Sequence, residues 1–324
     1  MEAWAVLRGS CLRDGPNGSL EVLEGPGGDL APVWPVSQVL AAAIDLSILT
    51  GDLDDAERIV RGLLRYERGN GYVPKPGQRR RYYDDNAWLG LCFAQLHLET
   101  GEDRWLRRTR RVFAFMREGQ DSDGGVRWVE RRRSRNTCST APAAQVALQL
   151  RLAGGGPATL AFARAALDWL DRTLRLSSGL YADHVDRQGI DRTVWSYNQG
   201  SAAGAHLLLF RATNSRAALE RARQTAVASL RHFRGDRLWK HPPVFNAIWL
   251  RNLLAVDAVE HLPGVDELLS DYLDRVWRSA RDARNMFTAG SIGSYDGTAT
   301  IDHAGLVRSF SLRAWPRSRT LDVC

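Results

Sequence analysis

The chain has 324 residues, 44% of them hydrophobic and 25% charged, which is the composition of an ordinary soluble globular protein. No run approaches the roughly 20 apolar residues that cross a bilayer, so no membrane span is expected. The net charge of +7 comes from arginine, with lysine only at Lys75 and Lys240, and without a recognition motif it does not predict nucleic-acid binding.

The N-terminal segment does not indicate a secretory signal peptide, and the cysteines do not indicate a metal site. Residues 1–20 contain Glu2 and have no early basic cluster or sustained apolar core, so we predict no secretory signal peptide. The compartment therefore stays unassigned, and is cytoplasmic on the sequence as given. Residues 1–30 are predicted to be a poorly defined N-terminal extension. The four cysteines are scattered, without CxxC spacing or a nearby histidine pair, so no structural zinc site is expected (Cys11, Cys92, Cys138 and Cys324).

A repeated pattern of helix pairs begins after the extension. Four turn signals recur in chain order, at Thr50–Asp52, Thr100–Asp103, Ala153–Gly156 and Ala212–Ser215. Each follows a segment that is apolar around most of its circumference and precedes an amphipathic one. We predict the preceding segments as buried inner helices: Ser37–Leu49, Asp85–Leu98, Ala141–Leu152 and Asn198–Arg211. We predict the following segments as outer helices: Leu53–Leu64, Arg104–Met116, Ala158–Leu174 and Arg216–Phe233.

The pattern continues to the end of the chain. A further pair is expected at Phe245–Val256 and Val265–Ser279, with a last helix near Asp302–Trp315. Gly179–Val185 is rich in residues that favour strands and is expected to belong to a small hairpin. The prediction is an all-α toroid, with six inner helices inside an outer layer, forming one domain over residues 31–324.

Polar and aromatic clusters stand just before or at the start of the inner helices, where the loops of a toroid converge at one mouth. They are Val33–Gln38, Tyr82–Trp88, Gly124–Trp128 running on to Asn136 and Thr137, Trp195–Gly200, and Val244–Asn246 with Trp249 and Arg251. Aromatic rings cover the C–H faces of a sugar, and amides and carboxylates bind its hydroxyls. The predicted substrate-binding residues are Trp34, Tyr83, Trp128, Asn136, Asp183, Tyr197, Asn198 and Gln199.

The adjacent acids Asp84 and Asp85 are the predicted catalytic residues. Glycoside hydrolysis needs two carboxyl groups flanking the scissile bond, and neighbouring residues entering a helix diverge by about 100°. Ionisation of one acid disfavours ionisation of the other, so one can stay protonated as the general acid. The alternative is that the pair caps a helix, where aspartate is favoured. One aspartate suffices for a cap, and the flanking Tyr82, Tyr83 and Trp88 favour the catalytic interpretation.

Two other polar groups are candidate sites. Asp183, His184 and Asp186 lie close in sequence, but their spacing is too loose to predict a metal site, and none is expected. The run Arg131-Arg132-Arg133 is typical of a solvated loop, with contact to an anionic substrate as the alternative.

The sequence resembles glycoside hydrolase family 76, the endo-α-1,6-mannanases. The resemblance is carried, in order, by Tyr82–Trp88, Thr100–Asp103, Gly124–Trp128, Asn136 and Trp195–Gly200, and it extends from about Trp34 to Arg251. It implies an (α/α)6 barrel that cleaves α-1,6-linked mannose chains with retention, with Asp84 as nucleophile, Asp85 as acid/base and no cofactor. Arg127 stands where the family often has an aromatic residue, and His184 where it often has glycine. Family members usually act outside the cell.

Other functions remain open at this point. A non-catalytic glycan-binding toroid would bind mannan without cleaving it, and a transglycosylase would pass the glycosyl group to another sugar. A sugar epimerase is disfavoured because none of the seven histidines falls within the aspartate or Asn-Gln clusters. The expected partner is an α-mannan or manno-oligosaccharide, bound by a monomer, with endo or exo action undecided.

Overall fold

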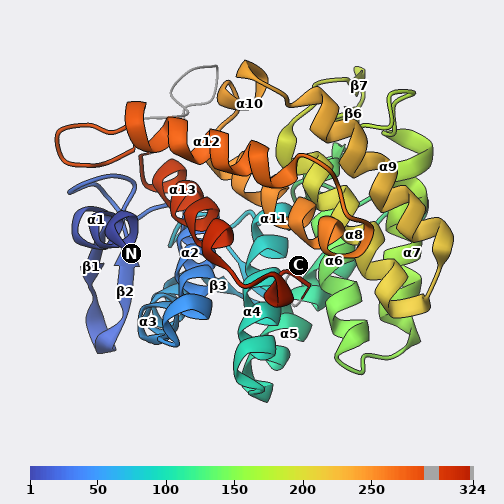
Figure 1. Ribbon diagram of the computed structural model, residues 1–324. Helices are drawn as coiled ribbons and strands as arrows, with labels where there is room; N and C mark the ends of the chain where they lie inside the picture. Colours follow the sequence, from blue (N-terminus) through green and yellow to red (C-terminus); the bar gives the residue numbers. More distant parts are fainter. Residues whose placement is uncertain (288–298, 322–324) are drawn as a thin grey trace.

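The structure is a computed structural model, and it describes residues 1–287 and 299–321 (Figure 1). Cys324 lies outside these residues. The helices are α1 (Glu2–Cys11), α2 (Val33–Thr50), α3 (Asp54–Gly62), α4 (Tyr83–Thr100), α5 (Asp103–Gly119), α6 (Thr137–Leu152), α7 (Pro157–Thr173), α8 (Ser196–Thr213), α9 (Arg216–His232), α10 (Asp236–Trp239), α11 (Pro243–Glu260), α12 (Val265–Ser279) and α13 (Ala299–Ala314). The short strands are β1 (Leu12–Asp14), β2 (Leu20–Val22), β3 (Glu67–Arg68), β4 (Gly71–Tyr72), β5 (Arg135–Asn136), β6 (His184–Asp186) and β7 (Gly189–Asp191).

Within the described chain, six helices form a closed inner ring. In ring order they are α2, α4, α6, α8, α11 and α13, and α13 packs back against α2. Each inner helix also packs against one outer helix, which is α3, α5, α7, α9, α12 and α1 in the same order. The fold is therefore an (α/α)6 barrel, and the predicted all-α toroid is confirmed (Figure 1).

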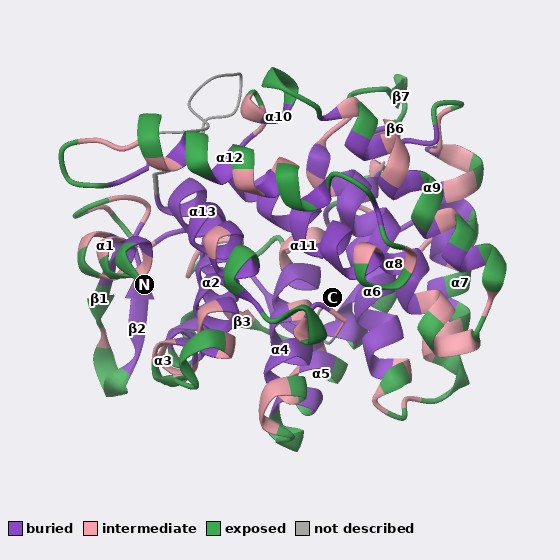
Figure 2. Cartoon of the chain, viewed as in Figure 1, coloured by how far each residue is buried: buried purple, intermediate pink, exposed green. Residues whose placement is uncertain are grey.

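Burial explains why the two layers have different sequences. Every residue of α6 from Thr137 to Leu150 is buried, because an inner helix is covered on all sides. The outer helix α5 buries only a stripe that includes Trp105, Val112 and Met116, and it exposes Arg104, Arg107, Arg110 and Arg117. Figure 2 shows this contrast between the buried central helices and the outer helices with one exposed side.

The turn signals end helices as expected. α2 and α4 end at Gly51 and Gly101, with φ of 73° and 70°, and α8 ends at Asn214 with φ of 56°. Glycine and asparagine adopt this left-handed conformation most readily, and their N–H groups bond back to the last turn of the helix. The repeated pattern in the sequence thus marks the loops at the base of the barrel, opposite the N-terminal ends of the inner helices.

Residues 1–30, expected as a poorly defined extension, form α1 and the antiparallel hairpin β1–β2. Ala3, Leu7 and Cys11 are buried at a spacing of four residues. α1 packs against α13, where His303 Nε2 lies 2.7 Å from the carbonyl oxygen of Ala3. The N-terminal helix therefore supplies the sixth outer helix, although it pairs with the last inner one.

The predicted hairpin after Gly179 is the β6–β7 pair, and β5 joins it to give an antiparallel sheet in the order β5-β6-β7.

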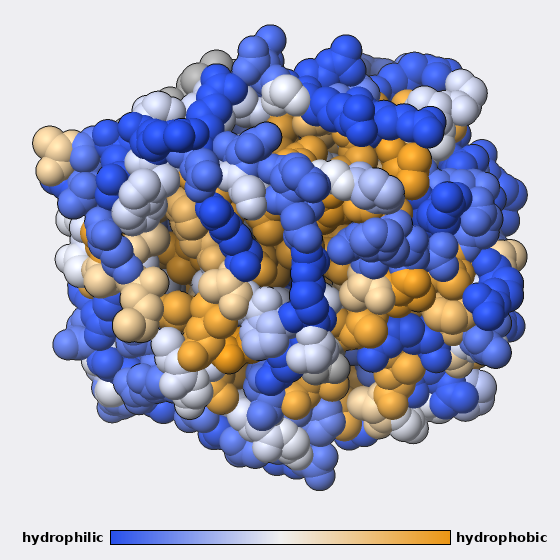
Figure 3. Space-filling view, in the orientation of Figure 1, coloured by the Kyte–Doolittle hydropathy of each residue, from blue (hydrophilic) through white to orange (hydrophobic). Residues whose placement is uncertain are grey.

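α2 has the length and mean hydropathy of a membrane span, but 78% of that window is buried inside the barrel. A core helix of this kind meets the same criteria as a spanning helix. On the face in Figure 3, hydrophilic side chains cover most of the surface, with hydrophobic residues visible between them.

Candidate active site

The N-terminal ends of the inner helices and the loops that precede them surround a cavity of about 1180 Å³. Four inner helices contribute the side chain of their second residue: Trp34 of α2, Asp84 of α4, Cys138 of α6 and Tyr197 of α8. The full lining is Trp34, Pro74, Arg80, Tyr82, Asp84, Asp85, Trp88, Trp128, Val129, Arg131, Arg132, Arg133, Ser134, Asn136, Cys138, Asp183, His184, Asp186, Arg187, Gln188, Tyr197 and Phe245.

Asp84 is held by one oxygen of its carboxyl group. The Trp128 indole N–H donates to Asp84 Oδ2 at 2.9 Å, and the Cys138 thiol approaches the same oxygen at 3.7 Å. Asp84 Oδ1 is buried and has no hydrogen-bond partner among the described residues. The N-cap of α4 is Tyr82, and neither aspartate occupies the capping position. The carboxyl group is thus fixed in orientation, with one oxygen left free of protein donors.

The two aspartates have different proton affinities. Burial raises the pKa of Asp84 to about 6, and the hydrogen bonds from Trp128, the local backbone and Cys138 oppose this rise. Burial, followed by the charge of Asp84, raises the pKa of Asp85 well above its ordinary value. The Asp85 carboxyl accepts no hydrogen bond from the part of the chain that is described. Both carboxyl groups therefore hold a proton more tightly than an exposed aspartate does, and the charge of Asp84 adds to this effect at Asp85.

Aromatic rings form the walls around the pair. The Trp34 and Trp88 rings lie 5.5 Å apart, and Tyr82 meets Trp128 edge-to-face at 5.2 Å. Next to Trp88, whose ring centroid lies 6.5 Å from that of Tyr197, the Tyr197 ring stacks on Phe245 at 4.0 Å. Trp128 is 39% exposed and lines the cavity, so part of its indole surface is accessible there. Such open rings suit the C–H faces of a pyranose.

Five of the predicted substrate-binding residues line the cavity together with the acid pair. These are Trp34, Trp128, Asn136, Asp183 and Tyr197. Tyr83, Asn198 and Gln199 do not line it. Tyr83 is 3% exposed and stacks on Phe115 of α5 at 4.6 Å, so the prediction for Tyr83 placed it on the wrong face of α4. Its neighbour Tyr82 lines the cavity instead.

Gln199 holds a loop. Its Oε1 accepts from the backbone N–H of Tyr181 at 2.7 Å, and its Nε2 donates to the carbonyl oxygen of the same residue at 2.9 Å. Asn86 binds both backbone groups of Tyr72 in the same way, at 2.7 and 3.0 Å. Both are the fourth residue of an inner helix, and both hold the segment arriving from the preceding outer helix. The conspicuous Asn-Gln pair of α8 is thus partly a structural device.

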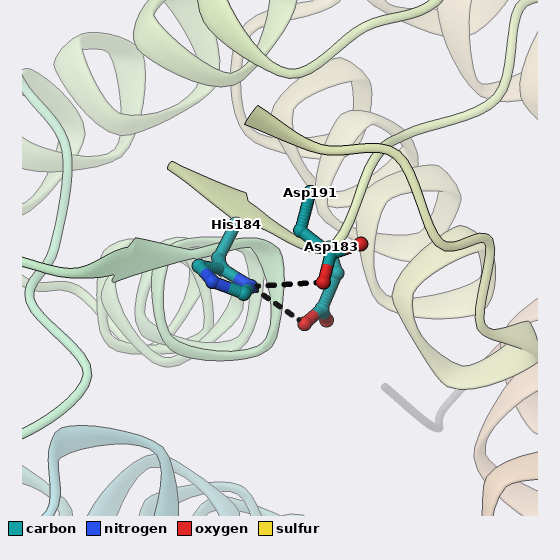
Figure 4. Close-up of side chains that lie close together, drawn as sticks. All are labelled: Asp183, His184 and Asp191. Carbon is teal, nitrogen blue, oxygen red and sulfur yellow. Dashed lines mark hydrogen bonds and ion pairs between the residues drawn. The ribbon is translucent and has the colours of Figure 1, made fainter. Parts of the chain in front are cut away.

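Asn198 supports the cavity from behind. Its Nδ2 donates to Asp183 Oδ1 at 3.1 Å, and its own Oδ1 is buried without a partner in the described residues. Asn198 therefore orients a lining carboxylate and is itself fully buried. Figure 4 shows the group around that carboxylate.

Asp183, His184 and Asp191 bring three possible ligand atoms within 4.8 Å of one another. The His184 ring faces the two carboxylates, with Nδ1 at 2.9 Å from Asp183 Oδ2 (Figure 4). Asp191 also accepts the backbone N–H of Thr193 at 2.8 Å. These bonds account for the proximity of the three side chains without an ion. That no metal is required stays a prediction.

Several lining residues fall outside the predicted site, among them Tyr82, Trp88, Cys138 and Phe245. For Trp88, the helical spacing within α4 could have given the signal. Asp84, Asp85 and Trp88 line the active-site cavity, and Trp88, Cys92 and Gln95 line a smaller internal cavity of about 40 Å³. These positions recur every three or four residues and define one face of α4. Tyr83 lies off that face, toward α5.

A six-pair helical barrel with two adjacent carboxyl groups in an aromatic cavity has the arrangement that glycoside hydrolysis requires, since that reaction uses two carboxyl groups at the cleaved bond. The model of glycosyl hydrolase family 76 matches residues 17–259. The chain belongs to glycosyl hydrolase family 76, and the resemblance found in the sequence is confirmed. Among proteins of curated function, none matches this sequence.

Solved structures of the family share the fold. A family 76 glycoside hydrolase from a bovine Bacteroides thetaiotaomicron strain has a TM-score of 0.82 and 21% identity, with 96% of this chain and 76% of that chain covered. A family 76 mannosidase of Bacteroides thetaiotaomicron gives 0.80 and 20%, with 96% of each chain covered. An inactive Salegentibacter α-1,6-mannanase in complex with α-1,6-mannotriose gives 0.76 and 18%, covering 97% and 98%. Two consecutive aspartates are replaced by asparagine in that variant.

Proposed function

We propose that the protein is a retaining glycoside hydrolase that cleaves α-1,6-mannosidic linkages in a mannan-type polysaccharide or glycoconjugate. The observation that carries the proposal is the adjacent pair Asp84 and Asp85 in the aromatic cavity, with their proton affinities separated in the direction that the mechanism needs. Asp84 is the nucleophile, and Asp85 is the general acid and base.

The first half of the reaction uses both residues at once. The Asp84 carboxylate attacks the anomeric carbon as Asp85 gives its proton to the glycosidic oxygen, so the C–O bond breaks and the leaving sugar departs as an alcohol. A water molecule then attacks the anomeric carbon of the mannosyl ester. Its proton passes to the Asp85 carboxylate, the ester bond to Asp84 breaks, and both side chains return to their starting states.

The mannoside specificity is supported by similarity. The Salegentibacter α-1,6-mannanase shares the barrel, and its inactive variant, which has two consecutive aspartates replaced, binds α-1,6-mannotriose. In this chain, Asp84 and Asp85 are consecutive and line the cavity. Trp34, Trp128 and Tyr197 supply ring surfaces for sugars bound on either side of the cleaved bond.

The direct test is incubation of the protein with linear α-1,6-mannan, followed by analysis of the released oligosaccharides. We expect Asp84→Asn and Asp85→Asn each to lower kcat by several orders of magnitude, since each removes one chemical role. Asp103→Asn is a matched control, because Asp103 is an exposed aspartate in the first turn of α5. NMR of the first product should show the α anomer.

Four results would contradict the proposal in whole or in part. Near-normal turnover in either active-site variant removes the assigned roles, and a β anomer as first product removes the retaining mechanism. Mannan binding without any product supports the non-catalytic glycan-binding alternative. Products longer than the substrate identify a transglycosylase.

A further inference from the structure

Five arginines line the active-site cavity: Arg80, Arg131, Arg132, Arg133 and Arg187. All five are exposed. None makes an ion pair or a side-chain hydrogen bond with any residue in the described ranges 1–287 and 299–321. Cleavage of a neutral mannan, as proposed above, does not require these positive charges.

Neighbouring arginines in the same loops behave differently. Arg81 pairs with Glu130 at 2.7 Å, Arg127 with Asp121, and Arg135 with Asp123. The acids within reach of these loops are thereby already engaged. The five arginines that line the cavity have no such acidic partner among the described residues. Their guanidinium N–H groups are therefore available to a ligand.

The five arginines come from three separate segments. Arg80 precedes α4, Arg131–Arg133 lie in the loop between α5 and β5, and Arg187 follows β6 in the β6–β7 hairpin. The Arg131–Arg133 run also lines an adjoining hollow of about 740 Å³, which Arg127 and Arg135 share. The run thus stands between two hollows, where an extended ligand would meet it on leaving the catalytic cavity.

The arginines act away from the cleaved bond. The pKa of Asp85 is raised by burial and by Asp84, and no arginine is among the groups that shift it. The other acids of the cavity, Asp183 and Asp186, lie on the β6 side, where Asp183 is bonded to His184 at 2.9 Å. Arg131, Arg132 and Arg133 therefore form a wholly positive part of the cavity wall, whereas Arg187 directly follows the acidic β6 strand.

Guanidinium groups present planar pairs of N–H donors that match the oxygens of phosphate and carboxylate groups. A cluster of one sign at the wall of a cleft also raises the local concentration of oppositely charged ligands. We propose that the substrate is an anionic α-mannoside, whose phosphate or carboxylate group is bound by Arg131, Arg132 and Arg133, with Arg80 and Arg187 adding to the field. This inference rests on the proposed function and specifies its substrate class.

The test compares kcat/KM for three oligosaccharides: α-1,6-mannotetraose, the same tetraose carrying one phosphate monoester, and the same tetraose carrying one uronic acid residue. At 50 mM salt we expect at least one anionic form to be preferred by about tenfold, because several exposed charge-assisted bonds add modest amounts each. The preference should shrink toward one at 500 mM salt, where screening is strong. The form that is preferred distinguishes phosphate from carboxylate.

Charge-matched variants assign the preference to residues. In R131A/R132A/R133A the ratio of anionic to neutral kcat/KM should fall close to one. R107A/R110A/R164A removes the same charge from exposed positions on α5 and α7 that lie outside the cavity, and the ratio should be unchanged. A preference that survives in the first variant, or disappears in the second, overturns the assignment to the arginine run.

Failure of this inference is separable from failure of the proposed function. Equal kcat/KM for neutral and anionic tetraoses in the wild-type protein overturns the inference, while cleavage of the neutral tetraose still upholds the hydrolase. If none of the three is cleaved, the proposed function fails. The binding affinities of the same three oligosaccharides, measured by calorimetry, then test the inference without activity. A preference for an anionic form that is lost in R131A/R132A/R133A supports the inference. Equal affinities overturn it.

Discussion

The indole N–H of Trp128 donates to Asp84 Oδ2 at 2.9 Å, across 44 positions of sequence, and so ties an aromatic wall of the cavity to the proposed nucleophile. The bond fixes the carboxyl group and stabilises its charged form. One residue thereby serves both the sugar-binding surface and the chemistry. This double role makes Trp128 a sensitive point for mutation.

Trp128→Phe keeps an aromatic ring but removes the donor. We expect kcat/KM to fall by about tenfold or more, since a hydrogen bond to a charged group contributes about 1.5–3 kcal/mol. The acid limb of the pH profile should also move to higher pH, because the Trp128 bond lowers the pKa of Asp84. Steady-state kinetics between pH 4 and 8 measures both effects.

Trp169→Phe is the matched control for that experiment. The Trp169 indole donates to Asp123 at 3.1 Å, but neither residue lines the active-site cavity. The control removes an indole–aspartate bond at another place, and its kinetics should stay close to wild type at a temperature where it is folded. An unshifted acid limb in Trp128→Phe would show that the indole does not tune the nucleophile.

The pH dependence of the wild-type reaction follows from the two carboxyl groups. Asp84 must be ionised to attack, and its pKa of about 6 places the acid limb of kcat/KM near pH 6. Asp85 must be protonated to act as the acid, and its pKa is raised well above the ordinary value, so activity declines again at higher pH. The profile should be bell-shaped, and activity that persists undiminished at pH 4 would contradict the state assigned to Asp84.

As the pH rises, ionisation of Asp85 should lower the free energy of unfolding. An ordinary salt-bridged carboxylate has the opposite effect. The pKa of Asp85 is higher in the folded protein than the unfolded value near 3.8, so the folded state binds the proton more tightly. The resulting penalty is absent below about pH 3.8 and grows as the pH rises toward the folded pKa. Asp85→Asn removes it, and we expect Tm at pH 8 to rise by about 2 °C over wild type, with little difference at pH 3.5.

Differential scanning calorimetry at both pH values measures this effect. Asp103→Asn serves again as the exposed control and should leave Tm nearly unchanged at both. A lower Tm for Asp85→Asn at pH 8 would mean that the Asp85 carboxylate is stabilised by its surroundings. Its assignment as the proton-holding member of the pair would then be wrong.

The fold was predictable because each layer of the barrel carries its own hydrophobic pattern. α6 is buried throughout and α5 along one stripe, and both patterns are visible in the sequence. The first and last residues of the helices were less predictable. α4 begins at Tyr83, two residues before the predicted start, since the polar residues of its first turn interrupt the apolar pattern. α1 went unpredicted because its three buried residues are too few to stand out.

The motifs that form the site were predictable from the sequence. Which residue of a motif lines the cavity was not always predictable. Tyr82 and Tyr83 are neighbours of one type, but Tyr82 is the extended N-cap of α4 and Tyr83 its first helical residue. The Tyr82 side chain therefore lines the cavity, and the Tyr83 ring packs on Phe115. The role of Gln199 depends on where the Tyr181 loop lies, which local sequence does not specify. The arginine run looked like a solvated loop because its position at the cavity wall is a tertiary property.

Close packing of the inner helices gives the last prediction. A Cβ at Gly200 of α8 would lie 2.5 Å from Cα of Trp249 and 3.0 Å from the carbonyl oxygen of Ile248, both in the backbone of α11. Backbone atoms cannot move aside as a side-chain end can, so the two helices would have to separate. We expect Gly200→Ala to lower the free energy of unfolding by about 1–3 kcal/mol, the usual cost of overpacking, despite the better helix propensity of alanine.

Gly9→Ala is the matched control, because Gly9 lies inside α1 and a Cβ there would meet no atom within 4 Å. The helix-propensity gain then acts without a clash, and the free energy of unfolding should stay the same or rise by up to about 1 kcal/mol. Urea denaturation of both variants gives the comparison. Since α8 also presents Tyr197 to the cavity, separation of α8 from α11 in Gly200→Ala should weaken manno-oligosaccharide binding as well. Equal stability of the two variants would contradict the close approach of α8 and α11.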